Sequence, residues 1–137
     1  MLENKAKILR GKSLNEIIKL FFGAEYLKSK IVLALLFFAI FINIADWLAL
    51  VLFLRPPVGA VVILHYNVYF GVDWAGKAKQ AYFLPLIGLI ILVINFSLSV
   101  YFYKLKERIA AYVLLITALA VELSLLISII SVIIVNY

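Results

Sequence analysis

The apolar positions of this chain fall into three long runs that are separated by shorter, more polar segments. The runs cover residues 31–54, 81–103 and 109–135. A helix needs about 20 mainly apolar residues to cross the hydrocarbon core of a bilayer. The pattern therefore predicts an all-α integral membrane protein with three transmembrane helices, joined by a loop at 55–80 and a short turn at 104–108.

A shorter helical pattern precedes the first run. In the segment SLNEIIKLFFG, Ser13 and Glu16 have the spacing of a capping box, which satisfies backbone N–H groups at the start of a helix. The apolar residues that follow recur along one helix face and are Leu14, Ile17, Ile18, Phe21 and Phe22. We expect an amphipathic interfacial helix on the membrane surface, with upstream Lys and Arg side chains beside anionic lipid headgroups. The same apolar face is also suited to docking on a soluble partner.

The 55–80 loop contains a stretch with the alternation of a β-strand. Residues 61–70, VVILHYNVYF, are rich in β-branched and aromatic side chains and precede Gly71. At period two, one face of this strand carries Val62, Leu64, Tyr66, Val68 and Phe70. An isolated strand leaves its backbone groups unpaired, so this one requires a hairpin within the loop, a second copy of the chain or a partner strand.

The composition supports lipid as the solvent of this chain. Hydrophobic residues make up 67% of it and charged residues 15%, whereas soluble domains are about 45–50% apolar and about 25% charged. The chain has no cysteine and one histidine, which removes disulfides, thiolate chemistry and most metal sites built from protein ligands. We expect no metal, no cofactor and no catalytic residue.

The net charge of +6 indicates orientation rather than a nucleic-acid partner, because the cations are grouped beside the predicted spans. Seven Lys and Arg residues precede the first span, three lie in the 104–108 turn and three in the 55–80 loop. The positive-inside rule then places the N-terminus in the cytoplasm, and the loop and the C-terminus outside. We expect a cytoplasmic or interfacial segment at 1–30 and a membrane domain at 31–137, in a bacterial or archaeal plasma (inner) membrane.

Four polar residues lie inside the predicted spans and are Asn43, Asp46, Asn95 and Glu122. Such side chains are costly in lipid and normally face protein or water. At a rise of about 1.5 Å per residue they occupy a similar depth. One interpretation is a structural cluster in which Glu122 is neutral and bonded to Asn43 or Asn95. The other is a proton or cation relay through Glu122 and Asp46, which would require an oligomer because three helices make a poor pore.

The third span has a second surface of small and hydroxyl residues. Glu122 shares one side of this helix with Ala111 and Ala118. The opposite side carries Thr117, Ala120, Ser124, Ser128 and Ser131. Small residues permit close helix packing in lipid. The third span therefore has two packing surfaces, and the chain has only two other spans to cover them. We expect this side to bind another subunit or a different membrane protein.

The histidine of the chain, His65, lies in the predicted strand. A catalytic triad would also need a nucleophile and an orienting acid. Asp73 is near in sequence, but the 55–80 loop contains neither serine nor cysteine. A histidine that hydrogen-bonds within a strand or lies at an interface is the commoner case, so we do not expect an enzyme.

Two stretches, LHYNVYFGVDWAG and YFLPLIGLIILVINFSLS, lie within residues 64–99. This region resembles small uncharacterised multi-span membrane proteins of reduced-genome bacteria. The resemblance implies a bacterial inner membrane and contributes no activity and no site residue. The function expected from the sequence is that of a non-enzymatic structural or accessory subunit, which binds a membrane partner or self-associates. The alternative is an oligomeric proton- or cation-conducting channel or transporter subunit that uses Glu122 and Asp46.

Overall fold

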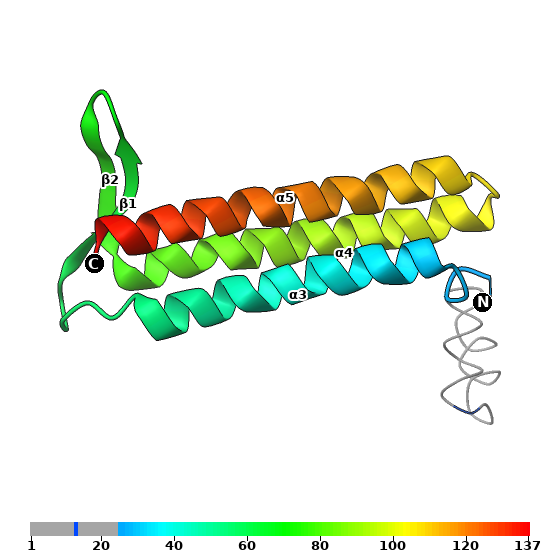
Figure 1. Ribbon diagram of the computed structural model, residues 1–137, viewed down its shortest axis with the longest axis horizontal. Helices are drawn as coiled ribbons and strands as arrows, with labels where there is room; N and C mark the ends of the chain where they lie inside the picture. The colour runs from blue at the N-terminus through cyan, green and yellow to red at the C-terminus, as the bar shows by residue number, and fades with distance from the viewer. Residues whose placement is uncertain (1–12, 14–24) are drawn as a thin grey trace, which may run out of the picture.

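The computed structural model describes residue 13 and residues 25–137. Three helices lie side by side, each antiparallel to the one before it in the chain, and a hairpin of two strands projects from one end of them (Figure 1). In chain order the elements are α3 (Lys30–Phe53), β1 (Val61–Asn67), β2 (Gly71–Lys77), η1 (Ala78–Tyr82), α4 (Phe83–Lys104) and α5 (Arg108–Val135). The interfacial helix predicted after Ser13 lies outside the described residues.

The three predicted spans are confirmed as helices. Their bounds differ from the predicted ones by no more than two residues. All three are long and apolar enough to cross a membrane, and much of their outward surface consists of large apolar side chains. We call the end of the bundle that carries the hairpin the hairpin end, and the opposite end, at residues 104–108, the turn end.

The turn between α4 and α5 is tight because backbone hydrogen bonds cap the C-terminal end of α4. Glu107 N donates to Phe102 O at 3.0 Å, and Lys106 N donates to Tyr103 O at 3.1 Å. This pairing is the Schellman motif, which requires a left-handed residue just after the helix. Here that residue is Lys106, with φ of 67°. The turn thereby reverses the chain and makes α4 and α5 neighbours along their whole length.

Small buried residues bring the helices close together. Helix α5 packs extensively against both α4 and α3, whereas α3 and α4 touch much less. The buried residues where the helices meet include Ala39, Gly88, Ser99, Ala111 and Ala118. Close backbone approach of this kind favours association in lipid, where apolar contacts alone give little preference for protein over acyl chains. The face of α5 predicted to carry Ala111 and Ala118 is therefore the face that packs within the bundle.

Of the three partners left open for the predicted strand over 61–70, the structure shows a hairpin within the loop, and it shortens the strand. Strand β1 ends at Asn67 and pairs antiparallel with β2, so the loop supplies its own partner strand. Residues 68–70 form the turn, and Gly71 follows with φ of 83°. The register is irregular between Ile63 and Tyr66, as at a β-bulge, where an extra residue breaks the period-two pattern. The predicted face is thus not continuous.

Candidate functional site

A buried hydrogen-bonded cluster joins the middle of α3 and of α5 to the first turn of α4. The amide nitrogen Nδ2 of Asn43, on α3, donates to Pro85 O on α4 at 3.0 Å and to Glu122 Oε2 on α5 at 3.1 Å. Glu122 is 0% exposed and Asn43 is 5% exposed. Burying polar groups of this kind is costly unless they are hydrogen-bonded. One amide therefore connects a backbone carbonyl of α4 with the carboxyl group of α5.

Gly88 makes room for this cluster on α4. A Cβ atom at this position would lie 2.7 Å from Glu122 Oε2, 2.8 Å from Leu125 Cδ1 and 3.2 Å from Asn43 Nδ2. The first two distances are shorter than normal non-bonded contacts. Helix α4 can approach the Glu122 carboxyl group this closely only because residue 88 has no side chain.

Asp46 lies one helical turn from Asn43 and is also 0% exposed. Among the described residues, neither of its carboxylate oxygens has a hydrogen-bond partner. The side chain is near enough to Glu122 for the two carboxyl groups to interact electrostatically. Asp46 and Glu122 are the two carboxyl groups within α3, α4 and α5, and both are buried.

Asn95 does not join the cluster. Its Nδ2 donates to Ile91 O on the same helix at 2.9 Å, and the side chain is half-buried. Of the two predicted amide partners of Glu122, the structure therefore brings only Asn43 to it. Of the four predicted intramembrane polar residues, Asn43, Asp46 and Glu122 are buried within the bundle. The fourth, Asn95, bonds to the backbone of its own helix.

The second face of α5 is exposed along its length, as the sequence pattern predicts. Thr117, Ala120, Ser124, Ser128 and Ser131 are all exposed. Each hydroxyl donates to the backbone carbonyl four residues earlier, at distances of 2.9–3.0 Å. The hydroxyl groups are thereby satisfied without a partner protein. The face is small, smooth and weakly polar, which suits close helix packing in lipid.

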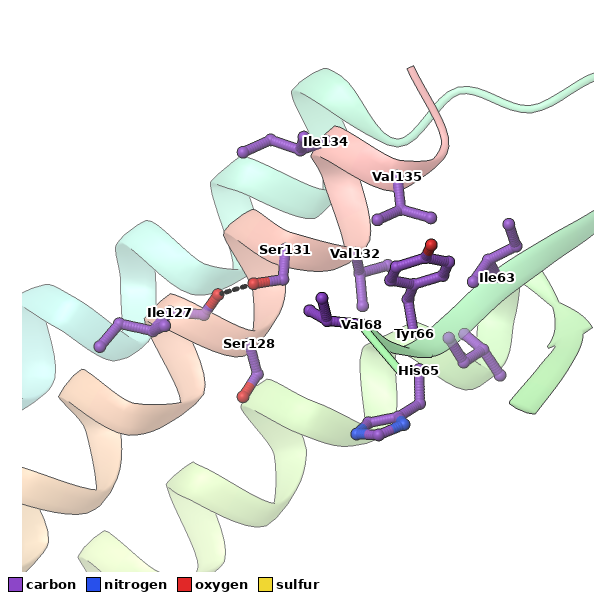
Figure 2. Close-up of a pocket in the computed structure, with 11 residues that line it drawn as sticks. Ile63, His65, Tyr66, Val68, Ile127, Ser128, Ser131, Val132, Ile134 and Val135 are labelled. Carbon is purple, nitrogen blue, oxygen red and sulfur yellow. Dashed lines mark hydrogen bonds between the residues drawn. The ribbon is translucent and has the colours of Figure 1, made fainter. Parts of the chain in front are cut away.

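A groove joins this face of α5 to the hairpin. Its volume is about 390 Å³, and its walls include Leu64, Tyr66 and Val68 of the hairpin and Ser128 and Ser131 of α5. In Figure 2 the hairpin residues face the last two turns of α5 across this space. Two surfaces that the sequence predicts separately as partner-binding, the strand and the third span, therefore meet at one place.

Two residues of the predicted strand surface do not line the groove. Val62 is 1% exposed, because it packs into the core at the hairpin end with Leu50, Ile129 and other apolar residues. Phe70 lies in the hairpin turn and is 85% exposed. Val62 belongs to the core that Leu64 also contacts, and Phe70 lies beyond the end of β1.

Sequence reasoning missed Asn136, which fastens the hairpin to the end of α5. Its Oδ1 accepts from Ile63 N at 2.8 Å, and its Nδ2 donates to Ile63 O at 2.7 Å and to Val132 O at 2.8 Å. The side-chain amide thus pairs with the free edge of β1 as a neighbouring strand would. The sequence shows a polar amide directly after a long apolar span, but nothing in it links that amide to the strand.

A second buried network holds the turn end. Tyr26 is 1% exposed and donates its hydroxyl to Ser99 Oγ at 3.0 Å, and Ser99 Oγ donates to Ala111 O at 2.9 Å. Burial raises the pKa of Tyr26, an effect that the hydrogen bond to Ser99 partly offsets. The phenol therefore stays protonated at neutral pH and acts as a donor that connects the segment before α3 with α4 and α5.

His65 is bonded within the hairpin, where its Nδ1 lies 3.1 Å from Asp73 Oδ2 of the facing strand. Within residue 13 and residues 25–137, no group of three or more His, Cys, Asp or Glu side chains is placed to hold a metal ion. Comparison of the chain with protein-family models, curated proteins and solved structures finds no match.

Proposed function

We propose that this chain is a non-enzymatic, multi-pass membrane protein that acts as a structural or accessory subunit. Its binding surface is the exposed face of α5 together with the groove below the hairpin, and the occupant is a transmembrane helix of a membrane partner or of a second copy. The observation that carries the proposal is the meeting of Ser128 and Ser131 with Leu64 and Tyr66 in one groove. A helix packed along the small residues of α5 would end against the hairpin.

The proposal includes an orientation and a location. The distribution of Lys and Arg supports a cytoplasmic turn end and an outer hairpin end, in a bacterial or archaeal plasma membrane. The absence of cysteine makes this testable with single cysteines at Ala60, Lys106 and Tyr137 and an impermeant thiol reagent on intact cells. We expect labelling at Ala60 and Tyr137 only. Labelling at Lys106 alone would invert the orientation.

Cross-linking tests the binding surface. A single cysteine replaces Ser124 on the proposed face, and a matched control replaces Ile44, which is 53% exposed on α3. In native membranes, a reagent with a maleimide and a photoreactive diazirine, which inserts into a neighbouring C–H or X–H bond with loss of N2, should capture a neighbour from position 124 and little from position 44. An adduct of twice the chain mass identifies a second copy, and any other discrete mass identifies a different subunit.

A bulky residue provides the second arm of this test. Ala120→Leu fills the face one turn from Ser124 and should lower the cross-linking yield, because helices then cannot approach closely. Equal yields at positions 124 and 44, unchanged by Ala120→Leu, would contradict the proposal.

The second candidate function is proton or cation conduction by an oligomer through Glu122 and Asp46. It is favoured by the fully buried Asp46 carboxyl group, which has no hydrogen-bond partner among the described residues, because intramembrane carboxyl groups commonly mark ion pathways. Its test is flux into liposomes. Wild-type flux that disappears in Glu122→Gln and Asp46→Asn would favour conduction, whereas absence of flux in all three would leave the accessory function.

A further inference from the structure

The tip of the hairpin presents three adjacent apolar side chains to the surroundings. Val68, Tyr69 and Phe70 are 84%, 91% and 85% exposed. Loop tips in water are usually small and polar. A contiguous apolar tip with a tyrosine instead has the composition of segments that lie at a membrane–water boundary, where aromatic residues with a polar end are enriched.

The direction of the hairpin is fixed at its base. The amide of Asn136 bonds both backbone groups of Ile63, and Gln80 Oε1 accepts from Lys77 N at 2.9 Å. From this base the hairpin leaves the bundle at a steep angle to the helix axes, so its tip lies to the side of α5 (Figure 1). With the helices crossing a membrane, the hairpin runs roughly along the membrane surface and its tip lies over the adjacent lipid.

The charges around this end of the bundle place the hairpin base at the level of lipid phosphates. Arg55, Lys77 and Lys79 are exposed. The one acidic residue of the 55–80 loop, Asp73, lies beside His65 within the hairpin. Three cations at the ends of α3 and α4 complement the negative phosphate layer. Because the hairpin runs along the surface from this level, its tip reaches the headgroup layer.

We propose that residues 68–70 form a membrane-docking surface, which inserts the side chains of Tyr69 and Phe70 into the headgroup layer beside the bundle. Its partner is the phospholipid interface, which offers apolar depth for the rings and phosphate groups for Arg55, Lys77 and Lys79. This inference depends on the helices crossing a membrane and is independent of whether α5 binds a partner helix. Docking at the tip would keep the hairpin in place above the groove.

Nitroxide labelling tests this proposal on the full chain, which has no native cysteine. Phe70→Cys carries the label at the tip. Val58→Cys is the control, because Val58 is 107% exposed in the loop that extends beyond the end of α3. Both residues are exposed, so the substitutions leave the packing of the bundle unchanged. Each protein is reconstituted in vesicles of phosphatidylcholine and phosphatidylglycerol, and label collisions with oxygen and with a water-soluble nickel chelate are compared.

Docking predicts that the label at position 70 collides often with oxygen and rarely with the nickel chelate, whereas the label at position 58 is reached by the chelate. Free access of the chelate to both labels would place the tip in water and overturn the proposal. Protection of position 70 from both reagents, with an immobilised label, would place the tip against protein and also overturn it. The α5 cross-linking test monitors different residues, so either result can fail without the other.

Discussion

The cluster at Asn43 and Glu122 predicts an asymmetry between two substitutions. Asn43 donates to both Pro85 O and Glu122. Glu122→Leu removes one acceptor but leaves the amide bonded to Pro85 O. Asn43→Leu removes the donor, and the other hydrogen bonds of the described residues include none to Glu122. The second substitution should therefore destabilise the fold more than the first, although both break the same contact.

The expected magnitudes follow from what each substitution leaves unpaired. Glu122→Leu loses one interhelical hydrogen bond, which contributes about 0.6–1.7 kcal/mol in membrane proteins. Asn43→Leu also leaves a buried carboxyl group without a donor, which costs about 1–3 kcal/mol. The double variant has no carboxyl group at position 122, so the loss of the Asn43 amide leaves none unpaired there. Its destabilisation should therefore be smaller than the sum of the two single values by about 1 kcal/mol.

The assay is reversible unfolding of the purified protein in mixed micelles, with the free energy of unfolding measured for the four proteins of the cycle. Ser97→Leu is the control, because Ser97 is exposed on α4, away from the proposed binding face, and its hydroxyl donates to Val93 O of its own helix. That change should stay within about 0.5 kcal/mol of the wild type. The reasoning would be refuted if Glu122→Leu were the more damaging single change, or if the two single values simply added.

Three further substitutions test other parts of the fold. Gly88→Ala should destabilise by about 1–3 kcal/mol, because the added methyl group overpacks the site against Glu122; an unchanged unfolding midpoint in micelles would contradict this. Asn136→Leu removes both hydrogen bonds to the Ile63 backbone. Faster hydrogen exchange at the Ile63 amide, with the exchange of α5 unchanged, would confirm that Asn136 holds the hairpin against the end of α5. Lys106→Gly should stabilise by about 1 kcal/mol, since glycine adopts the left-handed conformation without strain, and a lower or equal midpoint would contradict it.

The sequence predicts the helices well because the controlling signals are local. Span length, the prolines after α3 and the cations of the 104–108 turn lie within or beside each helix. Helical periodicity also placed Asn43 and Asp46 on one face of the first span, and both are buried. It placed Thr117 and Ser124 opposite Glu122, and the structure exposes the first two and buries the third.

The remaining contacts depend on geometry that periodicity does not contain. Asn95 has a depth and face compatible with the cluster, but its amide is satisfied by Ile91 O of its own helix, an option open to any helical amide. The bulge after Ile63 shifts the strand faces and has no sequence signature in a run of β-branched residues. The bond between Asn136 and Ile63 joins positions far apart in the chain, so only the folded arrangement reveals it.

The positions of the buried polar residues explain why α5 organises the fold. At the turn end Ser99 bonds Ala111 O, near the middle Asn43 bonds Glu122, and at the hairpin end Asn136 bonds the strand. Each of these three layers has one member on α5 or its C-terminal cap, and α3 and α4 touch little without it. Because lipid supplies no strong drive to bring apolar helices together, α3 and α4 have little to hold them until the third helix is in the membrane. The bundle should therefore close only after α5 has inserted, and α5 is the last of the three helices along the chain.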